Sequence, residues 1–299
     1  MPTHNNVCVT LVEKLHRQCE KLAQEAANGF AYEIVVADDG STDERSKARN
    51  RDINAIEHCR FIERETNVGR SRIRNFLAKE SRGEWLLFLD SDVDVRHDSF
   101  VGLYLDSQAS TVAYGGVRLK KNSAALHNNL RFRYEQAEAY KHSVWARLRS
   151  EHKSFRTTNF MVRRDIMLDN PFDETISAYG YEDVLFGKCL CERNIPVAHI
   201  DNPVILVDFE PNTLFVEKTE ESLRTLFQHR QDLAGYSTLL DGVGKMERWG
   251  LLKAMMLWHK IAGGMERRNL TGYNPSLLAY KLYKVGYYIS LSNTKTTLL

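Results

Sequence analysis

The sequence is poor in proline and cysteine, has no long apolar run and carries almost no net charge. No segment approaches the ~20 consecutive apolar residues of a membrane-spanning helix, and residues 1–6 lack the basic and then apolar pattern of a signal peptide. The formal net charge is +2 over 299 residues, whereas proteins dedicated to nucleic acid carry a strong basic excess. We therefore expect a cytoplasmic protein with no nucleic-acid partner, either free in the cytoplasm or peripheral to the inner face of the membrane.

The cysteines exclude a disulfide framework. They number five, an odd count, and their spacing is irregular, which suits reduced thiols. Cys189 and Cys191 stand one residue apart, but a zinc site would need two further ligands.

The length and the charge distribution indicate one large domain with a short appended segment. With 299 residues, 43% of them hydrophobic, the chain can bury a full core. Residues 241–299 carry nine Lys or Arg against three Asp or Glu, whereas residues 1–240 carry 32 against 36. We expect a domain over 1–240 and a basic, amphipathic helical tail over 241–299.

Hydrophobic periodicity predicts an α/β fold. The β-rich runs 7–12 and 33–37 enclose a helical stretch near 13–28, which makes a βαβ unit. A helix over 70–81 precedes an apolar strand over 85–89. The remaining expected elements are strands at 111–117, 160–162 and 204–207, helices at 128–150 and 181–193, and a helical region from about 213. The sheet is therefore expected to be mixed.

Two of the expected strands run directly into acidic residues. The strand at 33–37 ends in Asp38 and Asp39, and the strand at 85–89 ends in Asp90. In open α/β sheets, ligands bind at the carboxyl ends of strands, where the chain connections diverge. We therefore expect both acidic clusters to line one cleft.

The first cluster has a structural and a functional interpretation. Asp-Gly-Ser-Thr is good turn chemistry, and Ser41 or Thr42 can cap the next helix. A second carboxylate at the strand exit exceeds what a turn needs. Asp38 and Asp39 are therefore candidates to accept hydrogen bonds from a base N–H or from ribose hydroxyls.

The second cluster is a candidate metal site. Asp90, Asp92 and Asp94 alternate along an extended segment, which places them on one face about 7 Å apart. Three like charges repel one another unless a cation neutralises them. Carboxylate oxygens completed by substrate phosphates suit Mg²⁺ or Mn²⁺ rather than zinc. The alternative is a solvated acidic turn.

The third constellation is Tyr179-Gly180-Tyr181-Glu182-Asp183, a glycine turn before an apolar helix. Two acids there can simply favour the helix N-terminus through its dipole. In the functional interpretation, one of the two carboxylates is a general base that takes a proton from an attacking hydroxyl.

In order and spacing, these segments resemble glycosyltransferase family 2. The segments similar to its nucleotide-binding half are Asp38-Asp39-Gly40-Ser41-Thr42-Asp43, Asn67-Val68-Gly69, Arg74-Asn75 and Gly83 to Asp92. Those similar to its acceptor half, with a galactosyltransferase-like C-terminal motif, are Asn159 to Arg164, Phe172-Asp173-Glu174 and Tyr179 to Asp183. The resemblance covers about residues 5–230. It implies a GT-A fold, a Rossmann-like mixed sheet flanked by helices with a C-terminal helical extension, divided into a nucleotide-binding half (1–118) and an acceptor half (119–240).

The resemblance also implies which residues bind the nucleotide. Asp38 and Asp39 would lie at the nucleoside, with Asp39 at the base. Arg70 or Arg74 would contact the nucleotide, and Asp90 would face the ribose or the metal.

The same resemblance assigns the metal and the catalytic groups. Asp92 would bind the Mn²⁺ or Mg²⁺ that bridges the diphosphate, Asp183 would be the catalytic base, and Glu182 would contact the acceptor sugar. Many relatives have a histidine ligand after the Asn-Pro-Val strand, where this chain has Leu206, so His199 or Asp208 is left as a further ligand.

The sequence also departs from the family pattern at the first strand, because the expected strand at 7–12 lacks the proline-containing ending that is usual in the family.

The implied activity is an inverting, metal-assisted transfer of a sugar from a nucleotide-sugar donor, by resemblance a UDP-sugar. The acceptor would be a hydroxyl of a saccharide or a glycolipid in polysaccharide or glycolipid assembly, deprotonated by Asp183. A non-catalytic nucleotide-sugar or carbohydrate-binding protein would not need Asp183. A sugar nucleotidyltransferase would show a glycine- and lysine-rich phosphate loop, but residues 7–16 contain no glycine.

The tail has two interpretations. Its apolar residues recur at helical spacing, so that the helix can dock on its own domain; they are Leu278, Leu282, Val285 and Ile289. The alternative is a peripheral membrane contact through 245–290, because aromatic rings beside lysines favour the lipid interface. The aromatic residues are Trp249, Trp258, Tyr280, Tyr283 and Tyr287, and the lysines include Lys281 and Lys284.

Overall fold

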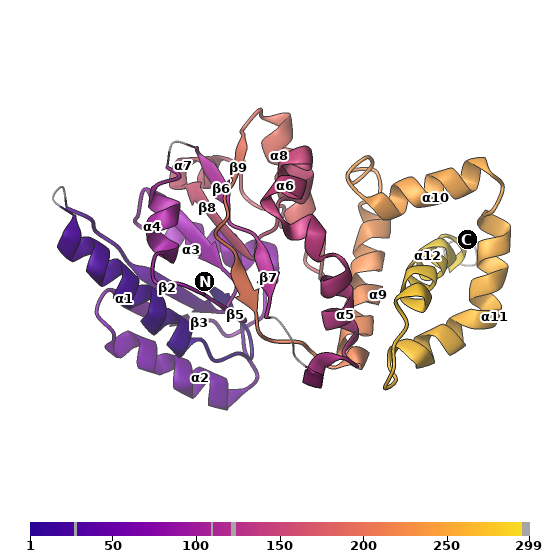
Figure 1. Cartoon of the computed structure of the whole chain (residues 1–299), viewed down its shortest axis with the longest axis horizontal. Coiled ribbons are helices and arrows are strands. Elements are labelled where there is room, and N and C mark those ends of the chain that lie inside the picture. Colours follow the sequence, from indigo (N-terminus) through magenta and orange to yellow (C-terminus); the bar gives the residue numbers. More distant parts are fainter. Residues whose placement is uncertain (27–28, 109, 121–123, 295–299) are drawn as a thin grey trace. The chain divides into compact units, whose positions relative to one another are not determined.

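The computed structural model describes residues 1–26, 29–108, 110–120 and 124–294 (Figure 1). Its internal contacts form two compact units. Unit 1 comprises Met1–Lys120, Ala139–Ser177 and Glu182–Asp208, and unit 2 comprises Lys121–Glu138, Ala178–Tyr181 and Phe209–Leu299. Every candidate catalytic, nucleotide-binding and metal residue lies in unit 1, and the expected tail lies in unit 2 with the residues from 209 onward.

Unit 1 begins with a parallel three-stranded sheet in the order β1-β2-β3. The strands are Pro2–Thr3 (β1), Ile34–Asp38 (β2) and Cys59–Glu63 (β3), and the helical segments between them are Val9–Glu25 (α1), Glu44–Asn50 (α2) and a 3₁₀ turn, Arg51–Ala55. β2 confirms the strand predicted at 33–37.

The strand predicted at 7–12 is wrong, because α1 begins at Val9. The buried side chains Val9, Val12 and Leu15 recur every three residues, and this helical face packs inward despite the β-branched residues. The first strand is instead β1, which pairs in parallel with the end of β2. The βαβ unit is therefore present with its first strand earlier in the chain. That strand contains Pro2, so the expected absence of a proline is also wrong.

A four-stranded mixed sheet carries the main core of unit 1, in the order β4-β8-β6-β9. Its strands are Trp85–Leu89 (β4), Val112–Tyr114 (β6), Asn159–Arg163 (β8) and Val197–His199 (β9). The helices of this part are Arg70–Glu80 (α3), Phe100–Leu105 (α4), Arg164–Asp169 (α7) and Glu182–Glu192 (α8). Stacked rings fill the core, with Phe88 4.9 Å from Phe160 and Phe172 4.4 Å from Phe186 between centroids. The predicted mixed sheet is confirmed.

A third, smaller sheet, in the order β5-β10-β7, brings the chain back beside the second acidic cluster. Its strands are Val93–Asp94 (β5), Val117–Leu119 (β7) and Val204–Leu206 (β10). Leu206 pairs with Val93 in the antiparallel register. The residues that follow β10 therefore lead back along the segment that precedes β5.

The single helix predicted at 128–150 is wrong. The chain forms Leu130–Ala137 (α5), Val144–Arg147 (α6) and short 3₁₀ turns around α6. The hydroxyl of Ser143 accepts from Ala146 N–H and so begins a new helix. The buried guanidinium of Arg147 then donates to backbone carbonyls, including those of Tyr114 and Ile200. These long-range bonds hold α6 against the sheet strands, which a continuation of α5 would not allow.

The part of unit 2 that the structure describes is helical. Besides α5, it contains Asn212–Gln228 (α9), Thr238–Arg248 (α10), Leu252–Leu270 (α11) and Leu277–Thr294 (α12). Gly250, with φ +70°, separates α10 from α11, so the helical region expected from about 213 is interrupted there. Tyr280 and Tyr283 of α12 are 4% exposed and join a core with Leu130 and Val216. In residues 1–294, apart from the short gaps, no helix is long and apolar enough to cross a membrane.

Candidate active site

The two acidic strand ends are joined by the short segment that follows β1. Asp39 N–H donates to the Thr3 carbonyl over 2.8 Å, and the Asn6 side chain donates to the Ser91 carbonyl over 2.7 Å. The carboxyl ends of β1, β2 and β4 therefore lie at one edge. This is the edge that the sequence predicts for a ligand.

The Asp38 carboxylate closes its own turn. It is buried and accepts from Ser41 N–H over 2.9 Å and from the Ser41 hydroxyl. This is the turn chemistry that the sequence also allowed. A carboxylate has about four lone-pair sites, so these bonds do not use the full acceptor capacity of Asp38.

Asp39 shapes the neighbouring loop. Its two oxygens accept from Val68 N–H over 2.9 Å and Gly69 N–H over 3.1 Å. The loops approach so closely that a Cβ on Gly40, where φ is +64°, would lie 2.4 Å from Asn67 N. Glycine is required there by both the backbone angle and the space. The Asp-Gly pair thus positions the Asn67-Val68-Gly69 loop.

Arg74 connects the end of β4 to the predicted catalytic pair. Its side chain, 1% exposed, donates to Asp90 Oδ1 over 2.6 Å. Its other terminal nitrogen lies 3.7 Å from Glu182 Oε1, and Arg70 Nη1 lies 3.5 Å from the same oxygen. One buried cation therefore holds a carboxylate of β4 and a carboxylate of α8 together.

Glu182 and Asp183 form the first turn of α8, as predicted. The chain enters this turn through two left-handed residues, Gly180 with φ +97° and Tyr181 with φ +69°. A positive φ at a tyrosine is uncommon and marks a constrained turn. The turn fixes the direction in which the two acids leave the backbone.

The pKa of Asp183 is raised from 3.8 to about 6. Burial is the main cause and the negative charge of Glu182 the second, while the charges of Arg156 and Arg70 oppose the shift. Asp183 also accepts from Val184 N–H over 2.8 Å. A carboxylate with this pKa is ionised at neutral pH and takes up a proton more readily than an ordinary aspartate, which suits a general base.

Two members of the second acidic cluster are neutralised by protein cations. Asp90 pairs with Arg74, and Asp94 pairs with Lys14 of α1. Repulsion among three acids is therefore a weaker argument for a metal than the sequence suggested. Half-buried Asp92 stands between them, where the chain passes from β4 to β5.

The donor set fits magnesium or manganese that shares its coordination with a substrate. Across the described residues, no group of three or more His, Cys, Asp or Glu side chains is placed to hold a metal. Mg²⁺ commonly binds through one or two carboxylates, with phosphates and water completing the octahedron. Asp92 and Asp90 are the two carboxylates of this cluster that would supply such ligands.

The two candidates for a further ligand differ in their surroundings. His199 Nδ1 lies 3.1 Å from Arg147 Nη1, and Nε2 lies 2.9 Å from the Glu151 carbonyl. Burial, as the main cause, lowers the pKa of His199 to about 4. Both ring nitrogens are thus engaged in the fold, which argues against His199 as a ligand. Asp208 is exposed and follows β10, whose Leu206 pairs with Val93 beside the acidic segment.

Sequence reasoning missed the residues that hold these loops. Asn5 Oδ1 accepts from Thr42 N–H over 2.8 Å and Asp43 N–H over 2.9 Å. The positive charge of Arg156 favours the ionised form of Asp183 and so lowers its pKa. The consecutive Asn5 and Asn6 after a proline could have suggested a loop with local bonds, but nothing in the sequence pattern marks Arg156.

Comparison with protein families identifies the family of the chain. The model of the family described as glycosyl transferase family 2 matches residues 1–169, which is more than half of the chain. Comparison with curated protein sequences gives no match.

Solved structures show a similar fold. The mannosyltransferase PcManGT from Pyrobaculum calidifontis, in complex with GDP-Man and Mn²⁺, superposes with a TM-score of 0.55 at 12% identity, over 98% of this chain and 84% of that chain. TarS 1–349 from S. aureus has a TM-score of 0.49 at 16% identity, over 99% and 90%. Glucosyl-3-phosphoglycerate synthase from Mycobacterium tuberculosis, in complex with Mg²⁺ and uridine diphosphate, has a TM-score of 0.46 at 15% identity, over 75% and 76%. The superposition with PcManGT, at 12% identity, shows a shared fold and no more.

Proposed function

Because the chain belongs to glycosyl transferase family 2 and has a GT-A fold, and is thus a glycosyltransferase that uses nucleotide sugars, we propose that it transfers the sugar of a UDP-sugar, with inversion, to a hydroxyl group of a saccharide or lipid-linked acceptor. The observation that carries the proposal is the Arg74 bridge, which joins Asp90 at the end of β4 to Glu182 at the start of α8. Donor-side and acceptor-side carboxylates are thereby held at one site.

Asp183 is the general base. Its carboxylate takes the proton of the acceptor hydroxyl while that oxygen forms a bond to the anomeric carbon of the donor sugar. The bond from the anomeric carbon to the diphosphate breaks and its electron pair leaves with the nucleoside diphosphate. A single displacement of this kind inverts the anomeric centre. The raised pKa of Asp183 and its place beside Glu182, which contacts the acceptor sugar, support this role of Asp183.

The nucleoside binds at the two loops that Asp38 and Asp39 hold. The Asp39 carboxylate supports Val68 and Gly69 and keeps acceptor capacity for a base N–H. Arg70 begins α3, where the helix N-terminus and its side chain both favour phosphate. Arg74 is buried and its guanidinium is engaged by the carboxylates of Asp90 and Glu182 and by the Arg70 carbonyl, so it positions Asp90 rather than touching the nucleotide.

Asp92, assisted by Asp90, holds Mn²⁺ or Mg²⁺, with Asp208 as the further protein ligand. When bound there, the ion stabilises the negative charge that develops on the leaving diphosphate. This chain's part is to keep the carboxylates aligned, which Arg74 does for Asp90.

The released product tests the proposed function. The full chain is incubated with UDP-glucose, UDP-galactose or GDP-mannose, a mixture of oligosaccharide and polyprenyl-phosphate sugar acceptors, and Mn²⁺. Release of the nucleoside diphosphate, stopped by a chelator, is the expected outcome, and release of UDP rather than GDP supports the donor. Release of pyrophosphate from a sugar phosphate and a nucleoside triphosphate would identify a nucleotidyltransferase. Tight donor binding without any release would identify a binding protein.

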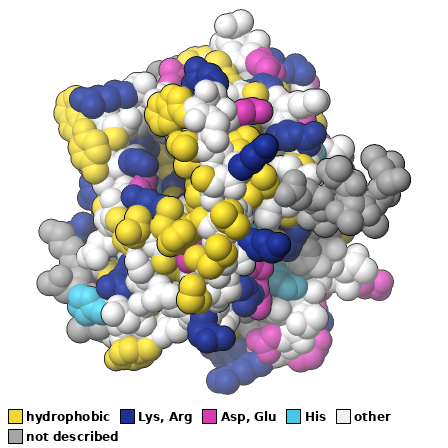
Figure 2. Space-filling view, turned by 90° about the vertical axis from the view of Figure 1, so that its right-hand side faces the viewer, with side chains coloured by type: hydrophobic (Ala, Val, Ile, Leu, Met, Phe, Trp, Pro, Cys, Tyr) yellow, Lys and Arg dark blue, Asp and Glu magenta, His cyan; other side chains and the backbone are white. Residues whose placement is uncertain are grey.

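A lipid-linked acceptor would bring the enzyme to a membrane surface, and α11 offers the contact. The α12 tyrosines expected at the interface are in the core, so α12 docks within its own unit. The exposed apolar stripe lies on α11, where Leu257 is 59%, Ile261 67% and Met265 63% exposed. Figure 2 looks onto this side and shows hydrophobic side chains gathered between Lys and Arg.

Charge and aromatic content favour an anionic lipid surface for this stripe. From Arg248 to Met265 the chain carries three Lys or Arg and no Asp or Glu. Trp249 is 71% exposed and Trp258 48%, and tryptophan favours the interface between water and lipid. The test is co-sedimentation of the full chain and of Leu257→Ser/Ile261→Ser with anionic and neutral vesicles. We expect salt-sensitive binding to anionic vesicles that falls about tenfold in the variant; equal binding of both proteins would place the contact elsewhere.

A further inference from the structure

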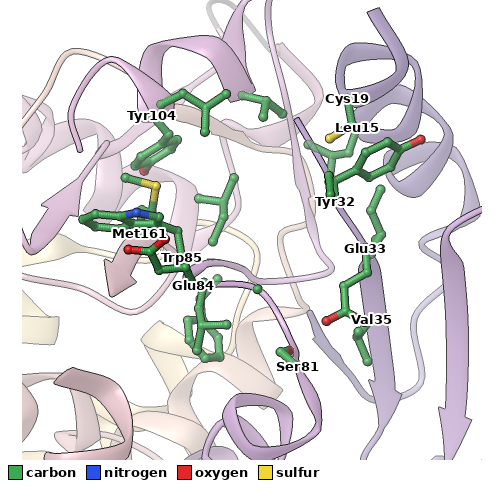
Figure 3. Close-up of a pocket in the computed structure, with 18 of the residues that line it drawn as sticks. Leu15, Cys19, Tyr32, Glu33, Val35, Ser81, Glu84, Trp85, Tyr104 and Met161 are labelled. Carbon is green, nitrogen blue, oxygen red and sulfur yellow. The ribbon is translucent and has the colours of Figure 1, made fainter. Parts of the chain in front are cut away.

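An apolar cavity of about 500 Å³ in unit 1, lined by residues of β2 and β4, lies apart from the candidate active site. Figure 3 shows Glu33 and Val35 on one side of the cavity and Trp85, Tyr104 and Met161 on the other. No candidate catalytic, nucleotide-binding or metal residue is among the residues that line it. The cavity therefore gives no direct support to the catalytic acids, whereas a helix of unit 2 does bond to the turn before them.

The turn that precedes Glu182 is bonded to α9. Residues 178–181 are grouped with the helices of unit 2, whereas Glu182 and the rest of α8 belong to unit 1. Tyr179 N–H donates to Glu221 Oε1 over 2.9 Å, and the Thr225 hydroxyl donates to the Tyr179 carbonyl over 3.1 Å. Glu221 and Thr225 stand four residues apart on α9 and therefore lie on one face of the helix. Both backbone groups of Tyr179 are thus bonded to side chains of α9.

The next residue of the turn packs closely on the same helix. A Cβ on Gly180, where φ is +97°, would lie 2.7 Å from Ser222 Cβ. Glycine is required there by the backbone angle and by the neighbouring helix. Tyr181, which directly precedes the first acid, also has a positive φ, of +69°. The backbone just before the two acids is therefore held in an uncommon conformation against α9.

The helix α9 is itself held by the other helices of unit 2. Glu220, next to Glu221 in the sequence, accepts at Oε1 from Arg267 Nε of α11 over 2.8 Å and from the Tyr283 hydroxyl of α12 over 2.7 Å. A hydrogen bond between ionised groups is about twice as strong as a neutral one. The turn before the acids therefore rests on a helix that is fixed on both of its other sides by α11 and α12.

We propose that Glu221 and Thr225 of α9 are positioning residues for the catalytic base Asp183, acting through the backbone of Tyr179. The inference rests on the proposed function, in which Asp183 takes the proton of the acceptor hydroxyl. A general base must stay within hydrogen-bond reach of that proton, and a displacement of about 1 Å can reduce the rate on the order of 10²-fold. In this role Glu221 and Thr225 affect turnover and not the binding of the donor.

Thr225→Val tests the proposal, because valine keeps the shape of threonine and removes the hydroxyl that donates to Tyr179. The matched control is Thr219→Val. Thr219 is also on α9 and is 6% exposed against 2% for Thr225, but its hydroxyl is bonded to the Tyr280 hydroxyl and the Phe215 carbonyl. Both variants should lower Tm by about 2–4 °C, because each loses a buried hydroxyl. Only Thr225→Val should lower kcat, by about tenfold, with the KM for the donor within about twofold of wild type.

Conservative variants distinguish the bonds to Tyr179 from general packing. Thr225→Ser keeps the hydroxyl and Glu221→Gln keeps an oxygen that accepts from Tyr179 N–H, so both should retain kcat within about twofold. Glu221→Ala should lower kcat about as much as Thr225→Val. Because burial raises the pKa of Asp183, a loosened turn that admits water should also move the acid limb of kcat to lower pH in Thr225→Val and Glu221→Ala.

Amide exchange of the peptide that contains residues 180–184 gives a readout without any substrate. It should be faster in Thr225→Val than in Thr219→Val. Equal kcat and an equal acid limb in these two variants would overturn the positioning role, and so would a raised KM for the donor with unchanged kcat. If no protein, wild type included, releases a nucleoside diphosphate, the proposed function fails, whereas faster exchange in Thr225→Val alone would still support the hold of α9 on the turn.

Discussion

The ends of β2 and β4 look alike in the sequence, since each is an apolar strand that stops in acidic residues, yet the fold treats them differently. The carboxylates of Asp38 and Asp39 accept hydrogen bonds from loop N–H and hydroxyl groups. Those of Asp90 and Asp94 pair with the cations Arg74 and Lys14. Asp38 and Asp39 thus shape a turn and a loop, whereas Asp90 and Asp94 are neutralised in ion pairs. Identical residue types at two strand ends therefore have different partners; in the proposed function the first pair would position a nucleoside and the second group would prepare a site for metal and phosphate.

The largest effect is expected from Asp92→Asn, in the acidic cluster that follows β4. It should reduce transfer by roughly 10³-fold or more, because a metal supplies several kcal/mol of charge stabilisation at a leaving diphosphate. Mn²⁺-dependent nucleotide binding, measured by calorimetry, should weaken as well. The matched control is Asp94→Asn, which loses only a half-exposed ion pair with Lys14 and should cost less than about 1 kcal/mol of stability. Near-normal turnover of Asp92→Asn in the presence of a chelator would remove the metal from the mechanism.

The acceptor side of the same network is tested by Asp183→Asn. Turnover should fall by roughly 10²–10⁴-fold, the usual contribution of a positioned base, while donor affinity survives. Wild-type kcat should rise with pH through about 6, the pKa of Asp183, because only the ionised carboxylate accepts a proton. The variant should lose this limb. Glu182→Gln serves as the comparison, and a larger loss there than at Asp183 would reverse the two roles.

The β2 side is expected to respond in KM rather than in kcat. Asp39→Asn weakens the bonds that hold Val68 and Gly69, so the KM for the donor should rise about tenfold. Asp38→Asn loses a bond within its own turn and should raise KM less. Steady-state kinetics at varied donor concentration distinguish the two. An unchanged KM with a reduced kcat in Asp39→Asn would mean that β2, like β4, serves the chemical step.

The smallest expected effect is on stability. The pKa of Asp183 is raised on folding, so ionisation of this group disfavours the folded state above pH 6 and has no such effect below its unfolded pKa near 4. At pH 7.5, Asp183→Asn should therefore have a free energy of unfolding about 1–2 kcal/mol higher than that of the wild type. This gain in stability should shrink as the pH falls from 6 to 4. Urea unfolding at pH 7.5 and at pH 4 measures this gain, and Asp241→Asn, at an exposed position, is the control. A gain that does not change with pH would contradict the assignment.

The predicted local elements were the most reliable ones. β2, β4, α3 and α8 lie where their apolar periodicity and flanking residues place them, because the signal for each is contained in about ten consecutive residues. The strand at 7–12 and the helix at 128–150 failed for the opposite reason. Val9 and Val12 favour a strand locally but pack as one helical face, and Arg147 binds carbonyls far away in sequence.

The site residues could be named from the sequence but not their partners. Acidic strand ends, a glycine turn and paired acids at a helix start are local patterns, and they identify Asp38, Asp39, Asp90 and Asp183 as candidates. Nothing local indicates that Lys14 neutralises Asp94. Likewise, the aromatic residues of 249–287 suggested one interface, whereas packing buries Tyr280 and Tyr283 and leaves the α11 stripe exposed.

The sequence by itself determined the family, the α/β class and the residue types at each strand end, because these follow from short-range order along the chain. Only the tertiary structure decided that Arg74 holds Asp90 and Glu182 together, that both nitrogens of His199 are engaged, and that β2 and β4 line one cavity. The physical reason is that hydrogen bonds, ion pairs and burial depend on distances between segments remote in sequence. Those distances are set when the whole core packs.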